Sequence, residues 1–186
     1  MIDDDKQQKQ MVLNLRPFSL PNDFQAVKTL TRDYDFWRYD RSHKFLSDEA
    51  VKRLDSIHSL IFDGMIMSQD KSKSPQTLIY GLSYLFQIDF TNRNAHFNFL
   101  CKNEHSRKIF FDLMMKYFFN SYGFHRLYCE LEDGDPNYKL FTECGMEICG
   151  TKKESRFYGG TYYDTTILSA NGSSWVDSKL PLKLLA

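Results

Sequence analysis

The sequence predicts a single α/β domain in which helices and strands alternate along the chain. Its 186 residues fit one compact domain, and 42% hydrophobic with 26% charged residues is the balance of an ordinary globular protein. Segments of alternating apolar and polar residues are interleaved with segments whose apolar residues recur at helical spacing. No internal repeat or linker divides the chain. We therefore expect one domain over residues 1–186, with residues 1–10 flexible and residues 170–186 forming a C-terminal tail.

Charge and cysteine usage argue against several classes of function. The 24 basic and 24 acidic side chains cancel, so no overall field attracts nucleic acid or an anionic membrane surface. The acidic N-terminus does not resemble a signal peptide, and no apolar run approaches the roughly 18 residues of a transmembrane helix. Cys101, Cys129, Cys144 and Cys149 follow no zinc-binding spacing, so we expect buried free thiols and no metal. These features predict a cytoplasmic protein.

The first half of the chain predicts two helices and a long hairpin. In order, its patterns indicate a strand over residues 11–20, a helix from residue 24, a second helix whose apolar positions run from Val51 to Leu60, an ambiguous segment 60–67 that favours a strand at its end, and two strands over 77–89 and 95–101. The helix-start signals are Pro21-Asn22-Asp23 for the first helix and Ser47 for the second. The 16% aromatic content is typical of a sheet-rich core or of an aromatic-lined cleft.

The second half predicts a central helix followed by strands on both sides of a shorter helix. The central helix covers residues 106–122 and ends at Gly123, and a strand follows over residues 125–132. Asp135 and Pro136 begin the shorter helix, which runs to about residue 144 and ends at Gly145. Two closing strands, over residues 146–153 and 161–168, flank a Gly-Gly turn. The tail from Ala170 onward has no clear partner.

Four short segments in this order resemble the GNAT superfamily of acetyl-CoA-dependent N-acyltransferases, and in particular its ribosomal-protein N-terminal acetyltransferase branch. The segments are "LRP" at residues 15–17, residues 117–127 against "YAF…LGLHRV", residues 140–146 against "LYEKLGF", and Gly150 with residues 158–164 against "G…DGEYHD". The resemblance covers about residues 12–169. It implies a mixed, mostly antiparallel sheet of six or seven strands flanked by about four helices. The sheet is then splayed between the strand ending at Cys101 and the strand starting at His125.

The resemblance also implies an acyl-CoA site at the start of the central helix, where free backbone N–H groups bind a pyrophosphate. The residues expected to bind the donor are Phe99, Leu100, Cys101, Lys102, Asn103, His105, Ser106, Arg107 and Lys108. Asn103 and His105 stand where the family has glycines, and Glu104 opposes an anion. Three alternatives therefore stay open: acetyl-CoA or another acyl-CoA binds in a rearranged way, the loop binds the phosphopantetheine of an acyl-carrier protein, or CoA binding has been lost.

Candidate catalytic residues follow from the same resemblance. His96 stands where the branch often has a glutamate that activates the amine, and an imidazole that titrates near neutral pH is a competent base. A half-exposed strand histidine is the alternative, and Asp89 or Glu130 would be alternative bases. Phe141 replaces the tyrosine that usually protonates the thiolate, so Tyr138, one turn earlier, is the candidate acid. A surface tyrosine, with the thiolate leaving unaided, is the alternative for Tyr138.

The acceptor site is expected between the first two helices, in the segment 34–40. Asp35 and Trp37, together with Asp89, are candidate substrate-binding residues, and a surface loop anchored by Trp37 is the alternative. The first hypothesis is transfer of an acyl group, most simply acetyl, from acyl-CoA to a primary amine of a small molecule or a protein N-terminus, by direct attack in a ternary complex. Its rivals are a carrier-protein donor and a non-catalytic binding module. We expect a monomer or homodimer.

Overall fold

The computed structural model describes residues 11–33, 48–54, 58–66, 76–102 and 104–176. Its centre is one seven-stranded sheet in the order β1-β2-β3-β4-β5-β7-β6. The strands are β1 (Met11–Pro17), β2 (Ser59–Ile66), β3 (Gln76–Asp89), β4 (Asn94–Cys101), β5 (Arg126–Glu132), β6 (Glu147–Tyr158) and β7 (Thr161–Asn171). All neighbours pair antiparallel except β4 and β5, which are parallel. The mixed, mostly antiparallel GNAT fold predicted above is confirmed.

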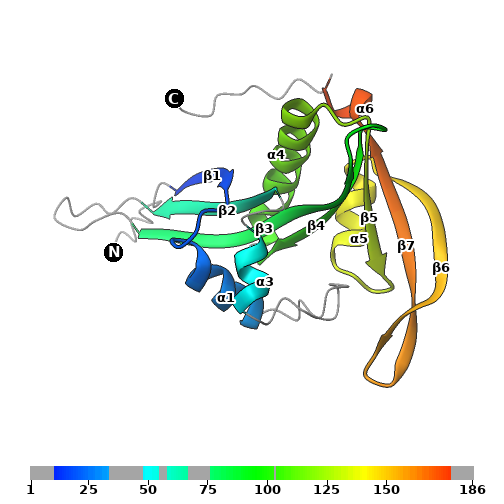
Figure 1. The fold of residues 1–186 in the computed structure, drawn as a ribbon, viewed down its shortest axis with the longest axis horizontal. Coiled ribbons are helices and arrows are strands. Elements are labelled where there is room, and N and C mark those ends of the chain that lie inside the picture. The colour runs from blue at the N-terminus through cyan, green and yellow to red at the C-terminus, as the bar shows by residue number, and fades with distance from the viewer. Residues whose placement is uncertain (1–10, 34–47, 55–57, 67–75, 103, 177–186) are drawn as a thin grey trace, which may run out of the picture.

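The helices cover the two faces of the sheet unequally (Figure 1). They are α1 (Phe24–Asp33), α3 (Asp48–Arg53), α4 (Glu104–Tyr122), α5 (Asn137–Glu143) and α6 (Gly172–Val176). Alternation along the strands divides the core into two clusters. Leu60 and Phe62 belong to the larger cluster, with residues of α4 and α5, whereas Ile61 belongs to the smaller cluster, with residues of α1. The helices α1 and α3 lie against β2–β4 and leave this face of β5–β7 uncovered by a described helix (Figure 1).

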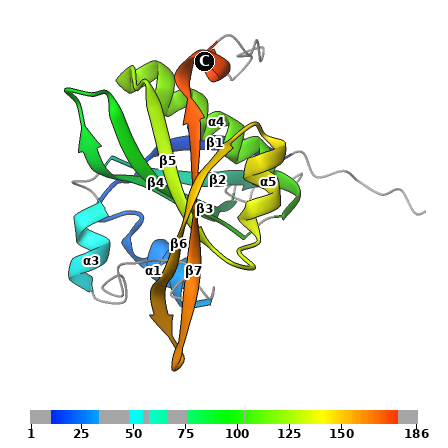
Figure 2. The same ribbon diagram turned by 90° about the vertical axis from the view of Figure 1, so that its right-hand side faces the viewer.

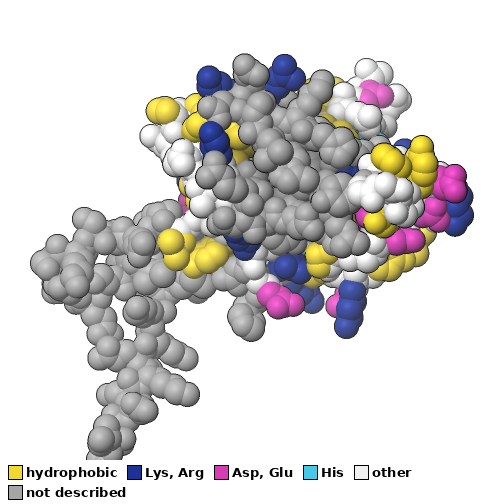
Figure 3. All heavy atoms as spheres, turned by 90° about the horizontal axis from the view of Figure 1, so that it is seen from below, with side chains coloured by type: hydrophobic (Ala, Val, Ile, Leu, Met, Phe, Trp, Pro, Cys, Tyr) yellow, Lys and Arg dark blue, Asp and Glu magenta, His cyan; other side chains and the backbone are white. Residues whose placement is uncertain are grey.

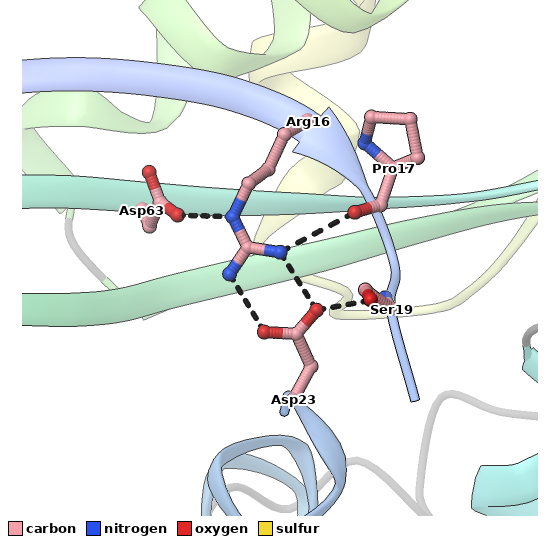
Figure 4. Close-up of polar contacts among 5 residues, drawn as sticks. All are labelled: Arg16, Pro17, Ser19, Asp23 and Asp63. Carbon is pink, nitrogen blue, oxygen red and sulfur yellow. Dashed lines mark hydrogen bonds and ion pairs between the residues drawn. The ribbon is translucent and has the colours of Figure 1, made fainter. Parts of the chain in front are cut away.

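A cluster of charges joins β1, β2 and the start of α1 (Figure 4). Arg16 donates from Nε to Asp63 at 2.6 Å, and from both terminal nitrogens to Asp23 at 2.6 and 2.7 Å. The backbone N–H of Ser19 also donates to Asp23, at 2.8 Å. Although burial favours the neutral acid, these hydrogen bonds hold the pKa of Asp23 below its usual value. The bidentate geometry fixes the direction in which the chain enters α1.

Several predicted boundaries differ from the structure. The first strand ends at Pro17 rather than residue 20, and Leu60, expected at the end of a helix, lies in β2. The strand predicted over residues 146–153 runs on to Tyr158, since β6 and β7 form a long hairpin that projects beyond the rest of the sheet (Figures 1 and 2). Its register shifts at two places, between Ile148 and Gly150 and between Lys152 and Arg156, and such shifts interrupt the alternation that a sequence reading follows.

The prediction that the tail from Ala170 onward has no clear partner is wrong for residues 170–176, and the rest of the tail lies outside the described residues. Ala170 pairs with Leu127 of β5, and the N–H of Gly172 donates to the carbonyl of His125 at 2.9 Å. Trp175 is buried, and its ring meets the Phe111 ring edge to face at 5.7 Å. Residues 170–176 therefore pack against one end of the larger core.

The cysteines also depart in part from their expected burial. Cys101 and Cys129 are buried and Cys144 is half-buried, as expected of thiols in a core, and burial raises the pKa of Cys129 well above its usual value. Cys149 is exposed, and its sulfur lies 3.0 Å from the hydroxyl of Ser169. Cys149 is exposed because it lies on β6, the strand at the edge of the sheet.

Candidate active site

The strands β4 and β5 pair along only part of their length. Their parallel register comprises Asn94 with Arg126, Ala95 with Leu127, and His96 with Tyr128. Beyond His96, β4 continues to Cys101 and β5 to Glu132, and neither pairs with the other. The two strands therefore diverge toward the start of α4. This splay was expected from the family resemblance, and it begins at His96.

His96 points away from the larger core. Its neighbours Ala95 and Phe97 both belong to the cluster under α4 and α5, so His96 lies on the opposite face of the sheet. The imidazole stacks on Tyr128, with ring centroids 5.3 Å apart, and lies 5.4 Å from the Phe86 ring. Its side chain is 22% exposed. The ring is thus held in one plane by aromatic neighbours while one part of it remains accessible.

A buried carboxylate lies beside His96. Glu130, on β5, has a side chain only 4% exposed, and its Oε1 is 3.9 Å from Nδ1 of His96. The ammonium of Lys152 lies 3.0 Å from the same oxygen. Because Lys152 belongs to β6 and β7 lies between β5 and β6, this side chain reaches across a strand to Glu130. We name these three residues the His96–Glu130–Lys152 row.

A second pair of charges lies further along the splay. Glu132 at the end of β5 and Arg156 on β6 approach to 3.7 Å, with side chains 0% and 8% exposed. Asp135 follows in the turn before α5 and accepts the Asn137 N–H at 2.7 Å. Burial raises the pKa of Asp135 to about 6, although its hydrogen bonds with Asn137 favour the charged form. The carboxyl end of β5 therefore gathers acidic groups that contact little solvent.

The predicted donor-binding residues lie around the other margin of the splay. Phe99, Leu100 and Cys101 form the end of β4, and the backbone N–H of Lys102 donates to Tyr80 of β3 at 2.8 Å. Arg107 on the first turns of α4 donates to the Cys101 carbonyl at 3.2 Å. Lys108 is exposed, whereas Ser106 is buried. His105 is part of α4, and Asn103 falls in a gap between described residues.

The other predicted residues are placed as follows. Tyr138 is in the first turn of α5 and is 38% exposed. Phe141 is buried, stacked on Phe111 at 4.3 Å, so it fills the larger core instead of the splay. Asp89 accepts hydrogen bonds from both nitrogens of Asn92, at 2.9 and 2.7 Å, and therefore stabilises the β3–β4 turn. Asp35 and Trp37 lie outside the described residues.

The site contains one functional candidate that the sequence did not single out. Lys152 was only one of several basic residues on a predicted strand, and nothing in its spacing indicates that it reaches Glu130. Glu130 was considered as an alternative base, and the structure brings it next to His96. The described residues include no group of three or more side chains suited to a metal ion, and no described helix is long and apolar enough to cross a membrane.

Comparisons with known proteins support the same fold. A spermidine N-acetyltransferase from Vibrio cholerae, determined with CoA and spermine, matches with a TM-score of 0.70 and 19% identity over 89% of this chain and 98% of that chain. A dodecameric structure of spermidine N-acetyltransferase from the same organism, in an intermediate state, gives 0.67 and 19% over 90% and 98%. The search of curated protein sequences found no significant match.

A family model described as an acetyltransferase (GNAT) domain matches residues 21–167, which is most of the chain. The superfamily expected from the sequence is thereby confirmed, whereas the ribosomal-protein branch stays a prediction, since the structural neighbours are spermidine N-acetyltransferases. The rival prediction of a non-catalytic module is not supported by this match. The chain belongs to the GNAT acetyltransferase family and is an N-acetyltransferase that uses acetyl-CoA as its acyl donor.

Proposed function

We propose that this protein transfers the acetyl group of acetyl-CoA directly to an aliphatic primary amine, with His96 as the general base. One observation carries the proposal. His96 is the last residue of β4 to pair with β5, at the point where the two strands diverge. His96 at that point lies on the face opposite α4 and α5, beside the part of the sheet that no described helix covers. Geometry of this kind is what a general base requires.

The donor side of the splay fits acetyl-CoA. The 19-residue helix α4 begins just after β4, so its N-terminal N–H groups and helix dipole favour phosphate oxygens. Basic side chains flank this end of the helix, and Glu104 is the one carboxylate of its described first turn. We propose that the backbone at Phe99, Leu100 and Cys101 pairs with the pantetheine arm, and that Lys102, Asn103, His105, Ser106, Arg107 and Lys108 surround the phosphates. The donor supplies an activated thioester, and the chain's own residues position it.

The reaction at His96 needs only a neutral imidazole. The reacting ammonium first loses one proton to solvent. The neutral amine nitrogen then attacks the thioester carbonyl, its C–N bond forms, and the second proton that the nitrogen loses passes to the imidazole. The C–S bond then breaks, and the CoA thiol is the second product. Tyr138, on the helix that follows the splay, is the proposed proton donor to the leaving sulfur. We keep Asp35, Trp37 and Asp89 as proposed contacts of the acceptor.

The acceptor is proposed to be a cationic amine, with polyamines as the first class to test. Two features support this. Glu130, Glu132 and Asp135 follow one another along β5 and its turn, on the side of the splay opposite the donor residues. The structural neighbours act on spermidine and one was determined with spermine. Viewed from the α1 and α3 side, the described surface mixes basic and acidic side chains, so recognition would depend on local carboxylates rather than on overall charge (Figure 3).

The experiment compares two histidine variants across a panel of amines. CoA release from acetyl-CoA is measured with spermidine, spermine, glucosamine and a peptide with a free N-terminus, and products are identified by mass. We expect His96→Gln to lower kcat/KM by at least about 100-fold, while His125→Gln, an exposed histidine outside the row, changes it less than about twofold. Binding of CoA, measured by calorimetry, should be equal in both variants.

Two outcomes would contradict the proposal. If His96→Gln keeps the full rate at every pH, His96 is not the base. If no amine is acetylated from acetyl-CoA but acetyl-phosphopantetheine on an acyl-carrier protein is consumed, the donor assignment fails. Equal activity on all amines would leave the acetyl transfer intact and remove the preference for polyamines.

A further inference from the structure

We propose that Glu130 is a positioning residue that orients His96 and, together with Lys152, sets the pH at which His96 accepts the amine proton. The inference rests on the proposed role of His96 as base. Its geometry is the row in which Glu130 Oε1 lies 3.9 Å from His96 Nδ1 and 3.0 Å from Lys152 Nζ. The carboxylate is therefore shared between an imidazole on one side and an ammonium on the other.

Burial makes this sharing effective. The Glu130 side chain is 4% exposed and that of His96 is 22% exposed, whereas the Lys152 side chain is 46% exposed. Charges that contact little water interact more strongly than charges on the surface. The carboxylate therefore acts strongly on His96, and the ammonium reaches it from the solvent side. Removing the charge of either Glu130 or Lys152 is therefore expected to change the protonation equilibrium of His96.

The two neighbours act on His96 with opposite sign. A carboxylate stabilises the imidazolium form of His96, because an opposite charge favours the charged form. An ammonium destabilises that form, both by direct repulsion and by neutralising the carboxylate. The other titratable or charged residues that the described strands place on this face include Tyr84, Arg126, Tyr128, Glu147 and the pair of Glu132 with Arg156. Glu132 and Arg156 form an ion pair with each other at 3.7 Å, whereas Glu130 and Lys152 are the two charges that form one row with His96.

The row also selects one ring nitrogen for the reaction. Nδ1 is the nitrogen turned toward Glu130. Stacking on Tyr128 and contact with Phe86 hold the ring plane, so the other nitrogen, Nε2, is directed elsewhere. A carboxylate that attracts the Nδ1 proton fixes the tautomer in which Nε2 carries the lone pair. Nε2 then takes the proton of the attacking amine, and the resulting imidazolium directs its Nδ1–H at Glu130.

The test uses two substitutions that must shift the pH profile in opposite directions. Glu130→Gln removes the carboxylate, so the acidic limb of kcat/KM should move down by about one pH unit. Lys152→Gln removes the ammonium, so the same limb should move up, by a smaller amount. In Glu130→Gln the value of kcat also falls, while KM for acetyl-CoA stays constant. Glu130→Asp, which keeps the charge, should restore most of the wild-type pH profile.

Lys153→Gln is the matched control. Lys153 is the next residue of β6, but its ammonium lies 2.6 Å from Asp164 instead of Glu130. Its loss removes the same charge from the same strand, so a profile that shifts equally in Lys152→Gln and Lys153→Gln would reveal a general charge effect and overturn the proposal. Shifts of the same sign in Glu130→Gln and Lys152→Gln would overturn it as well.

A second readout separates this inference from the proposed function. The His96 ring is titrated by nuclear magnetic resonance without substrate, its signal being assigned by its absence in His96→Gln. The His96 pKa should fall in Glu130→Gln and rise in Lys152→Gln. If those shifts occur but no amine is acetylated, the coupling stands and the function fails. If acetylation proceeds and the His96 pKa moves in neither variant, the coupling fails and the function stands. Should Glu130→Gln not fold, Lys152→Gln and Glu130→Asp decide the matter.

Discussion

Two groups of buried carboxylates, one at the β1 edge of the sheet and one at the carboxyl end of the interior strand β5, have different surroundings. At the β1 end, Arg16 donates one hydrogen bond of 2.6 Å to Asp63 and two, of 2.6 and 2.7 Å, to Asp23. At the β5 end, the ion pairs of Glu130 with His96 and of Glu132 with Arg156 are 3.9 and 3.7 Å long. The first group shares one guanidinium through short hydrogen bonds, whereas in the second group the 3.0 Å contact of Lys152 with Glu130 is accompanied by two longer ion pairs.

The carboxyl groups show the difference in their titration. Hydrogen bonds from Arg16 and Ser19 overcome burial and lower the pKa of Asp23, whereas burial prevails at Asp135 and raises its pKa to about 6. A carboxylate with a purely structural role is stabilised when a guanidinium donates hydrogen bonds to both of its oxygens. A carboxylate at the divergence of two strands retains the capacity to respond to another charge, which is what binding a cation or tuning a base requires.

The largest expected effect is on stability, at the β1 end. Arg16→Met should lower the free energy of unfolding by about 4 kcal/mol, because it leaves two buried carboxylates without their common cation. The pH profile of acetylation by the folded fraction should not change, since Arg16 is not part of the row. The measurement is urea denaturation at pH 7, with a lower midpoint and an unchanged slope.

The control for Arg16→Met is Lys153→Gln, on strand β6 of the β6–β7 hairpin. Lys153 also has a 2.6 Å ion pair, but its side chain is 79% exposed, and exposed pairs contribute little. We expect almost no change in the denaturation midpoint. A similar midpoint in both variants would show that burial of Asp23 and Asp63 does not distinguish the two pairs.

Local pattern was sufficient to predict most of the fold. The helical spacing in α4, the positive φ of 64° at Gly123, and the β3–β4 hairpin depend on neighbours within a few residues. The tail was missed because its buried aromatic residue is Trp175, and the adjacent pair Trp175-Val176 after Gly-Ser-Ser has no period. Its partner Phe111 is 64 residues away in the chain.

The sequence could indicate only those features of the site that are determined within a single strand. Side chains alternate along β4, so His96 faces away from Ala95 and Phe97, which belong to the larger core. Its neighbours depend instead on the register of β4 with β5 and on a side chain of β6 that crosses β7, and neither is local in sequence. The register shift between Lys152 and Arg156 adds a further uncertainty that alternation cannot resolve.

The second prediction tests whether Asp135 and Asp23 change the stability of the fold with pH in opposite directions. The pKa of Asp135 is about 6 in the folded protein against 3.8 for an unperturbed group, so its contribution to stability is present below pH 3.8 and is lost as the pH rises through 6. The wild type should therefore lose about 2 to 3 kcal/mol relative to Asp135→Asn between pH 4 and 7. The amide keeps an oxygen for the Asn137 N–H. Denaturation of both proteins at each pH measures the difference.

The control for the second prediction is Asp23→Asn. The folded pKa of Asp23 is lowered, so the stability that Asp23 provides is present at neutral pH and is lost as the pH falls. The wild type should therefore lose its advantage over Asp23→Asn on acidification, with the sign opposite to that of Asp135→Asn. If stability relative to the wild type changed with pH in the same direction in both variants, the distinction between the two groups of carboxylates would be lost.

The smallest expected effect is on the leaving group. Tyr138→Phe should lower kcat by about tenfold, equivalent to about 1.4 kcal/mol, because a CoA thiolate departs with less help than an amine or alcohol. KM for acetyl-CoA and the denaturation midpoint should stay unchanged, because Tyr138 is 38% exposed. The buried contact of α5 is made by Phe141, one helical turn later. Tyr162→Phe, at an exposed tyrosine on β7, is the control. An unchanged kcat in Tyr138→Phe would mean that the thiolate leaves without an acid from this helix, and that the chemistry of the splay rests on the His96–Glu130–Lys152 row alone.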